Sequence, residues 1–370
     1  MLEVGRHGVQ ATVTDVSAQH RNLAEFTTLR LGGPARNLTV CRTTEELIAT
    51  VTGADRAGEP ILLIGGGSNL VIGDDGFPGT AVLVATDGIE FGADETGPHV
   101  TAAAGVNWDR LVAETVENGF GGLECLSGIP GAAGTTPVQN VGAYGVEVAQ
   151  ALRGVQLLDR RTGEIAWHAP EDLGLAYRTS RLKGRDDEVV LAVSFRLGDG
   201  GRSAPIRYRE LAAALGVAEG ESADAALVRA QVLKLRRGKG MVLDDADHDT
   251  WSAGSFFTNP IVAAGELPQI LDRIRARLGD EVRIPQFPAD GGTKLSAGWL
   301  IERAGFVKGF PGPQAPARLS TKHTLALTNR GAARTADLIE LAARVRDGVR
   351  AEFGVSLHPE PVFVGCALPA

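Results

Sequence analysis

Apolar and polar residues follow one another along this chain in short stretches that predict both strands and helices. A continuous apolar run typical of a buried strand occupies 61–64, and strands are also predicted at 100–104, 155–159 and 189–196. Apolar residues at helical spacing occupy 44–54, 107–119, 223–237, 267–278 and 335–354. Strands and helices alternate without a tandem repeat. The pattern therefore predicts α+β domains.

Residues with capping preferences mark the expected helix ends. A Thr-Thr-Glu-Glu sequence opens the first helix at Thr43, where acidic residues suit the positive end of the helix dipole. Thr335 is the expected cap of the last helix, and Gly354 its stop. A glycine-rich stretch at 198–203 predicts a turn or flexible joint between domains.

Length and charge limit the classes of function. The 370 residues suffice for two or three domains, and 44% hydrophobic with 22% charged residues is ordinary for a globular protein. The net charge of −8 argues against a nucleic-acid-coating surface. An anionic nucleotide ligand would therefore require a locally basic cleft.

Cysteine usage and the N-terminus favour a cytoplasmic protein. Cys41, Cys125 and Cys366 are far apart and lack a C-x-x-C spacing, which fits neither a disulfide framework nor a zinc site, so no metal is expected. Charged residues interrupt any signal-peptide pattern, and no apolar run approaches the ~18 residues of a membrane span. Residues 1–20 are expected to form a loose extension.

The loop at 129–145 is the first sign of a ligand site. It is rich in glycine, nearly free of charge, and carries polar side chains at Thr135, Thr136, Gln139 and Asn140. Glycine lets the backbone approach a flat ligand closely, and amides can read the edge of a heterocycle. A large planar cofactor fits this composition, although taken alone a glycine-rich surface turn fits it as well.

A second loop upstream favours the cofactor. The apolar run 61–64 leads directly into Gly65-Gly66-Gly67-Ser68-Asn69. Consecutive backbone N–H groups in such a turn form an anion-binding nest, to which a serine hydroxyl adds a donor. The glycine spacing is not that of a Rossmann motif, and no Walker Gly-Lys-Ser/Thr is present. The loop therefore predicts a pyrophosphate site outside the doubly wound dinucleotide fold.

Six motifs in a fixed order carry a family resemblance. They are Gly-Gly-Gly-Ser-Asn at 65–69, the loop 129–145, Tyr-Arg-Thr-Ser at 177–180, Gly-Ser-Phe-Phe-Thr-Asn-Pro at 254–260, Leu-Ser-Ala-Gly-Trp-Leu-Ile at 295–301 and His-Pro-Glu at 358–360. This order is similar to that of the MurB family, the UDP-N-acetylenolpyruvoylglucosamine reductases, from about residue 20 to the C-terminus. The wider flavin-binding family shares only the first two loops.

The resemblance implies two α+β subdomains that cradle FAD, in the PCMH-type fold, and a C-terminal α+β substrate-binding domain. The expected ranges are 21–97 for the first subdomain, joined by 358–370, then 98–200 for the second, and 201–357 for the substrate-binding domain and connecting segments. It also implies non-covalent FAD, NADPH as co-substrate, and UDP-N-acetylglucosamine enolpyruvate as substrate. A monomer is expected.

The catalytic roles come from the same resemblance. Hydride passes from flavin N5 to C3 of the enolpyruvyl group, and Ser255 supplies a proton to C2. Arg178 is the electrophile for the substrate carboxylate, which a guanidinium binds through two parallel hydrogen bonds. Glu360 is the second acidic residue and assists the enol intermediate.

Binding roles are carried over residue by residue. The expected cofactor-binding residues are Gly65, Gly66, Gly67, Ser68, Asn69, Gly131, Gly134, Thr135, Thr136, Gln139, Asn140, Gly142, Ala143 and Tyr144. The expected substrate-binding residues are Tyr177, Tyr208, Lys239, Asn259 and His323. At the last position part of the family carries glutamine, so the role of Lys322-His323 stays open.

Two other functions are compatible with parts of the sequence. The first is an FAD-dependent alcohol or hydroxyacid oxidase of the same cofactor-binding architecture, whose flavin is often tethered through His or Cys. His99 and Cys125 are the only such residues between 42 and 167, and neither lies in a recognisable tethering motif. The second is a nucleotide-sugar-binding protein without catalysis, against which Arg178, Ser255 and Glu360 together argue.

Overall fold

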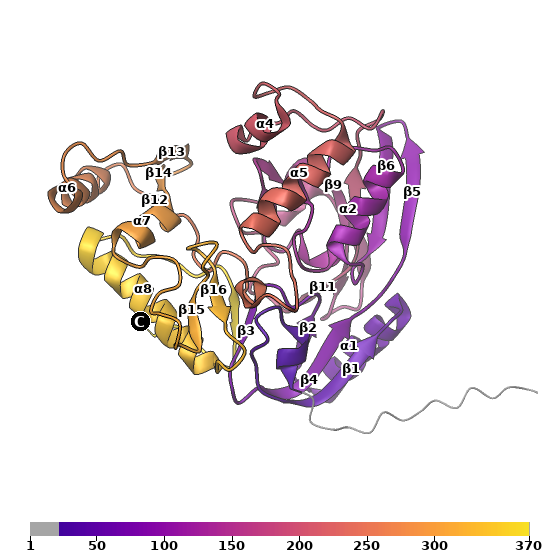
Figure 1. Cartoon of the computed structure of the whole chain (residues 1–370). Coiled ribbons are helices and arrows are strands. Elements are labelled where there is room, and N and C mark those ends of the chain that lie inside the picture. Colours follow the sequence, from indigo (N-terminus) through magenta and orange to yellow (C-terminus); the bar gives the residue numbers. More distant parts are fainter. Residues whose placement is uncertain (1–21, 370) are drawn as a thin grey trace, which may run out of the picture.

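The computed structural model describes residues 22–369, which form three packed units (Figure 1). The expected N-terminal extension at 1–20 lies outside the described residues. The units are built from separate sheets and combine strands with helices, which confirms the α+β prediction. Within 22–369, no helix is both long and apolar enough to cross a membrane.

The first unit is a parallel sheet in the order β1-β4-β2 with one helix. Its elements are β1 (Ala35–Cys41), α1 (Thr44–Ala57), β2 (Ile61–Ile64) and β4 (Phe77–Val84). The expected cap of α1 is confirmed, because the Thr43 hydroxyl accepts from the Glu46 N–H and the Glu46 carboxylate accepts from the Thr43 N–H. The helix buries Leu47 and Val51 in a cluster that also includes residues of the second unit.

A short parallel pair ties the C-terminus to this region. β3 (Leu70–Ile72) follows the first glycine loop directly and pairs with β17 (Val362–Val364). The Val362 N–H also donates to the carbonyl oxygen of Asn69. The end of the chain thus lies beside the first glycine loop, and it carries Glu360 there.

The second unit is an antiparallel sheet in the order β10-β9-β11-β6-β5. Its strands are β5 (Ile89–Asp94), β6 (Gly97–Ala103), β9 (Leu152–Asp159), β10 (Ile165–His168) and β11 (Glu188–Arg196). Its helices are α2 (Trp108–Glu117), α3 (Val148–Ala151), α4 (Arg209–Leu215) and α5 (Ala225–Gly238). The core contains an edge-to-face pair of Trp108 and Phe195, with ring centroids 5.5 Å apart. The second glycine loop leaves this core, and its end forms the hairpin of β7 (Gly142–Ala143) and β8 (Val146–Glu147).

The third unit combines two small sheets with three helices. Its strands are β12 (Ile261–Val262), β13 (Gln286–Ala289), β14 (Gly292–Leu295), β15 (Ala317–Leu319) and β16 (Leu327–Asn329). Its helices are α6 (Leu267–Leu278), α7 (Ala297–Arg303) and α8 (Thr335–Phe353). Phe256, Phe257 and Phe353 are fully buried in its core. Thr335 is the first residue of α8 and not its cap. Its hydroxyl donates to the carbonyl oxygen of Ile72 in the first unit.

The packing differs from the expected domain boundaries in two places. β5 pairs with β6, so the second sheet begins at Ile89, ahead of the expected boundary at 97/98. Helices α4 and α5 share a hydrophobic core with α2 and the second sheet, although 201–357 was expected to form the substrate-binding domain. A bidentate ion pair between Arg229 and Asp109, with distances of 2.6 and 2.9 Å, holds α5 against α2. Residues 201–238 therefore belong by packing to the second unit.

Candidate functional site

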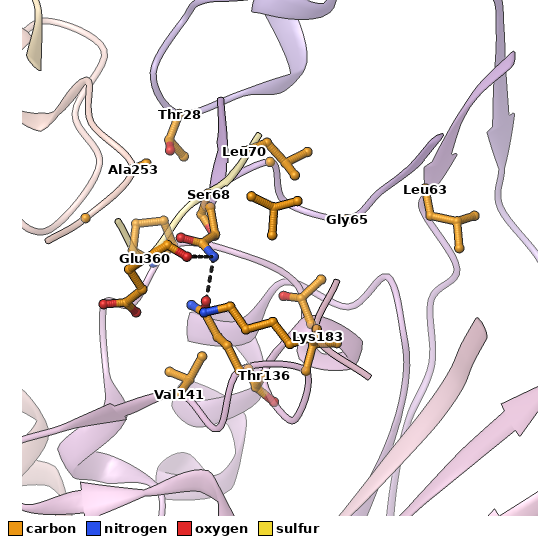
Figure 2. Close-up of a pocket in the computed structure, with 18 of the residues that line it drawn as sticks. Thr28, Leu63, Gly65, Ser68, Leu70, Thr136, Val141, Lys183, Ala253 and Glu360 are labelled. Carbon is orange, nitrogen blue, oxygen red and sulfur yellow. Dashed lines mark hydrogen bonds between the residues drawn. The ribbon is translucent and has the colours of Figure 1, made fainter. Parts of the chain in front are cut away.

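A cavity of about 730 Å³ is lined by residues of all three units. This volume lies within the usual range of small-molecule pockets. The expected site residues that line it are Gly65, Gly67, Ser68, Asn69, Gly134, Thr135, Thr136, Gln139, Gly142, Arg178, Ser255 and Glu360. Figure 2 shows Ser68 and Glu360 on one side and Lys183 extending toward them from the other.

The two glycine loops pack directly against each other. A β-carbon added to Gly66 would lie 2.4 Å from the α-carbon of Gly131, far closer than real atoms approach. Gly67 has a φ of 60°, and a β-carbon there would lie 1.8 Å from the carbonyl oxygen of Phe26. Gly66 and Gly131 do not line the cavity. They let the loops meet, so that Gly65 and Ser68 form part of its wall.

The contact between the loops predicts that Gly66→Ala is destabilising. The new methyl group would force the loops apart, and such overpacking typically lowers the free energy of unfolding by about 1–3 kcal/mol. Gly53→Ala is the matched control, because a β-carbon at this exposed site in α1 meets nothing within 4 Å. Its gain in helix propensity should raise stability by up to about 1 kcal/mol. Urea denaturation of both variants tests this, and equal stability would contradict the packing role of Gly66.

Amide side chains join the two loops to the C-terminal segment. The Asn69 amide donates to the Gln139 side-chain oxygen and, at 3.4 Å, to the carbonyl oxygen of Glu360 (Figure 2). The hydroxyl groups of Thr135 and Thr136, which were expected to contact the cofactor, form hydrogen bonds within the loop. Each donates to a backbone carbonyl three residues earlier, at 2.7 Å. These bonds fix the loop shape, while both threonines still line the cavity.

Arg178 is positioned by a tight turn. Ala176 and Thr179 exchange backbone hydrogen bonds at 3.0 and 3.1 Å, and Arg178 between them has a φ of 57°, which is uncommon for a non-glycine residue. Asn140 supports the turn by donating to the Ala176 carbonyl oxygen at 3.1 Å. Asn140 is buried and does not line the cavity, so its side chain acts here within the protein.

The Arg178 side chain connects the turn to Glu360. It donates to the carbonyl oxygen of Gly142 at 2.8 Å, and its Nε lies 3.5 Å from Oε1 of Glu360. Burial raises the pKa of the Glu360 carboxyl, while the positive charges of Arg178 and Lys183 oppose that rise. Burial likewise lowers the pKa of the Lys183 ammonium group. The Glu360 carboxyl is thus accompanied in the cavity by two nearby cations, Arg178 and Lys183.

Ser255 reaches the same region through backbone pairing. The Glu360 N–H donates to the carbonyl oxygen of Phe256 at 2.9 Å, and the Thr258 N–H donates to that of His358 at 3.0 Å. The segments 255–258 and 358–360 therefore run antiparallel, side by side. Gly254 precedes Ser255 with a φ of 71°, and a β-carbon there would meet nothing within 4 Å. The backbone beside Ser255 is consequently open on the glycine side.

Most of the expected substrate-binding residues form a second group near the C-terminal end of α5. The rings of Tyr144 and Tyr208 pack edge to face at 5.3 Å, and Lys239 Nζ lies 5.9 Å from the Tyr144 ring centre. Lys239 also contacts Glu210 at 2.7 Å. Tyr144, expected at the cofactor, therefore lies among the expected substrate residues. Burial raises its phenol pKa to about 12.

A half-buried arginine links this group to the cavity. Arg236 lines the cavity, donates to the carbonyl oxygen of Met241 at 2.8 Å, and leaves its buried Nε without a partner among the described residues. Burial lowers the Arg236 pKa to about 10, so the side chain stays charged near neutral pH. Burial, with nearby cations, lowers the pKa of His323 to about 4, so His323 is neutral there. The group as a whole is basic, as an anionic ligand requires in this acidic protein.

Several expected residues have other surroundings. Ala143 lies on β7 and does not line the cavity. The Asn259 side-chain oxygen accepts from the Ala297 N–H at 2.9 Å, at the start of α7. Tyr177 is flanked by two cations, the Arg178 guanidinium at 5.3 Å and Lys294 Nζ at 4.7 Å from the ring centre. The sequence interpretation missed Lys183, Arg236 and Lys294, although Lys183 follows Arg178 by five residues and Lys294 immediately precedes the 295–301 motif.

The cavity residues fit FAD. Part of the wall is apolar, as a flat adenine or flavin ring requires, with Ile61, Leu62, Leu63, Phe77, Val84, Val189 and Val190. In the glycine loops, Ser68 and the neighbouring amides suit a pyrophosphate and the edge of a heterocycle. Within 22–369, no cluster of His, Cys, Asp and Glu could hold a metal ion.

Comparisons with known proteins identify the family of both parts of the chain. Residues 35–168 match the model of the FAD binding domain, and residues 245–364 match that of the UDP-N-acetylenolpyruvoylglucosamine reductase C-terminal domain. The reductase of this name from Nocardia farcinica is 64% identical over 98% of this chain and 92% of its own length. That from Saccharopolyspora erythraea is 63% identical over 94% of this chain and 95% of its own length.

A solved structure shows the same overall architecture. The crystal structure of MurB from Thermus caldophilus is 27% identical, covers 94% of this chain and 98% of its own, and superposes with a TM-score of 0.61. The coverage includes both the FAD-binding part and the C-terminal part. The chain therefore belongs to the MurB family of UDP-N-acetylenolpyruvoylglucosamine reductases and is an FAD-dependent oxidoreductase.

Proposed function

We propose that this protein uses NADPH to reduce the enolpyruvyl group of UDP-N-acetylglucosamine enolpyruvate, giving UDP-N-acetylmuramate for peptidoglycan synthesis. The observation that carries the proposal is the meeting of Arg178, Glu360 and Ser255 at one cavity, beside loops suited to FAD. Bound FAD would accept a hydride from NADPH and deliver it to C3 of the enolpyruvyl group. The side chains must then bind the carboxylate and supply a proton at C2.

Arg178 is suited to bind the substrate carboxylate. An enol ether next to a carboxylate accepts hydride poorly, because negative charge builds on the carboxylate as the new C–H bond forms. A fixed guanidinium stabilises that charge, and the tight turn and the bond to Gly142 fix Arg178 before substrate arrives. In the resting site the Arg178 Nε lies 3.5 Å from the Glu360 carboxylate.

Ser255 is suited to supply the proton at C2. A hydroxyl is a weak acid in water, but a carbanion at C2 is a strong base, and the cavity excludes much of the competing water. Glu360 lies on the neighbouring backbone, and burial raises the pKa of its carboxyl. A carboxyl whose pKa is raised gives up its proton less readily than an exposed glutamate does, so it is suited to assist a neighbouring hydroxyl in proton transfer. We assign Ser255 as the proton donor and Glu360 as the residue that assists the enol intermediate.

The basic group at the end of α5 is suited to bind the UDP diphosphate. Lys239→Ala should raise KM roughly 10–100-fold and leave kcat nearly unchanged, because a charged hydrogen bond contributes about 1.5–3 kcal/mol to binding. Lys234→Ala is the matched control, since Lys234 is an exposed lysine on the same helix. Steady-state kinetics with varied substrate measure both. An unchanged KM for Lys239→Ala would remove Lys239 from substrate binding.

Product analysis tests the proposed reaction as a whole. Incubation of the FAD-loaded protein with NADPH and UDP-N-acetylglucosamine enolpyruvate should yield UDP-N-acetylmuramate, two hydrogens heavier by mass spectrometry, with one NADPH consumed per product. NADPH oxidation that is not matched by this product would contradict the proposal. The monomeric state, the cytoplasmic location and the use of NADPH as co-substrate stay predictions from the sequence.

A further inference from the structure

Lys183 lies in the cavity without a role in the reaction as described so far. Its ammonium group donates to the carbonyl oxygen of Arg178 at 3.1 Å. Figure 2 shows the side chain extending through the cavity toward the side that carries Glu360. Lys183 is half-buried, and this burial lowers the pKa of its ammonium group. A positive charge at this position therefore needs acceptors or carboxylates nearby.

The bond to Arg178 acts on the turn that presents the guanidinium. Arg178 holds a left-handed φ of 57°, a conformation that needs support from its surroundings. Asn140 holds the turn from one end, at the carbonyl oxygen of Ala176. Lys183 holds it at the carbonyl oxygen of Arg178 itself. The two side chains together fix the direction in which the guanidinium leaves the backbone.

Lys183 also places a second positive charge near the Glu360 carboxylate. Arg178 and Lys183 are cations whose charge opposes the rise in the pKa of the Glu360 carboxyl. Arg178 is 3.5 Å from Glu360 but is also the residue proposed to bind the substrate carboxylate. When the substrate carboxylate pairs with Arg178, Lys183 remains as the other positive charge near Glu360.

We infer that Lys183 is a positioning residue of this site: its ammonium group fixes the backbone of Arg178 and balances the charge of Glu360 in the cavity. The inference rests on the proposed function for its catalytic consequence. The effect of the Lys183 charge on the Glu360 carboxyl does not depend on the proposed function, because both groups belong to the protein itself.

The pH dependence of turnover separates this role from a purely structural one. Lys183→Met removes the charge and the donor, so the Glu360 carboxyl should lose its proton only at higher pH. The limb of the kcat/KM profile that reports Glu360 should move alkaline by about one pH unit or more. Lys183→Arg keeps the charge and should keep the limb near its original position. Lys234→Met, which removes one exposed positive charge, should not move it. An unmoved limb in Lys183→Met overturns the inference.

Infrared titration of the FAD-loaded protein gives a second measurement that needs no substrate. The carboxyl band that disappears in Glu360→Gln reports protonation of Glu360 directly. This band should titrate at higher pH in Lys183→Met than in the parent, and Lys183→Gln, which keeps a donor without charge, should follow Lys183→Met. Equal titration in all three proteins overturns the inference. If the parent fails to reduce the substrate, the proposed function fails, while this titration still decides the role of Lys183.

Discussion

Ser255→Ala is expected to leave reduction of the bound flavin by NADPH at its parental rate and to slow reoxidation by UDP-N-acetylglucosamine enolpyruvate ~10²-fold or more. The two half-reactions share the cavity, but only the second needs a proton at C2. Ser255 lines the cavity on the segment paired with Glu360, so its loss removes a donor from the place where the proton is needed. Stopped-flow absorbance measures each half-reaction separately.

A conservative variant provides the control for Ser255. Ser255→Cys keeps a dissociable proton on a side chain of similar size, so it should recover part of the reoxidation rate. The position is open on its glycine side, which leaves room for the larger sulfur atom. If Ser255→Ala reoxidises as fast as the parent, Ser255 is not the donor, and another group at the cavity must be sought.

Arg178→Ala is expected to slow reoxidation by ~10²–10³-fold, the usual effect of removing one preorganised group that stabilises developing charge. Flavin reduction by NADPH should change far less. Substrate affinity should fall less than the rate, because the proposed contact strengthens as charge builds on the carboxylate. Half-reaction rates measured over a range of substrate concentrations separate the two effects.

Arg178→Lys tests whether the shape of the guanidinium matters. Lysine keeps one positive charge but cannot form two parallel hydrogen bonds with a carboxylate, so most of the loss should remain. Arg161→Ala is the control for loss of an arginine, because Arg161 is exposed and pairs with Asp159 away from the cavity lining. An effect of Arg178→Ala confined to KM would show that the residue binds the ground state and does not act on the transition state.

Local patterns predicted the elements well because their causes are local. The capping box at Thr43 and Glu46 formed as expected, and the apolar run at 61–64 is strand β2. The direct passage from β2 into the glycine loop is also present. Family membership likewise followed from motif order, because motifs spread over most of the chain rarely coincide by chance.

The partners of each element were harder to predict. Helical periodicity showed that α5 has an apolar face, but it could not show that this face packs on α2 and the second sheet. The hydrophobic effect has no direction, so a sequence pattern does not name the surface that covers it. Helix α5 was therefore expected in the substrate-binding domain, and β5 in the first subdomain, while the structure places both in the second unit.

The sequence indicated which residues lie near the site, but not what each of them contacts there. Gly66 and Asn140 were expected to face the cofactor, yet Gly66 packs against Gly131 and Asn140 supports the Arg178 turn. Such roles depend on contacts between distant segments. Lys183 and Arg236 were missed for the same reason, because only the fold shows that these lysine and arginine side chains enter the cavity.

The most direct test of the central claim is the visible spectrum of the FAD-loaded protein, reduced anaerobically with NADPH and then mixed with UDP-N-acetylglucosamine enolpyruvate. The proposed function predicts that NADPH bleaches the flavin and that the substrate restores the oxidised spectrum in the absence of oxygen. A flavin that NADPH bleaches but the substrate leaves reduced would contradict the assignment of this substrate. A flavin that stays attached to the denatured protein would favour a covalently flavinylated oxidase instead.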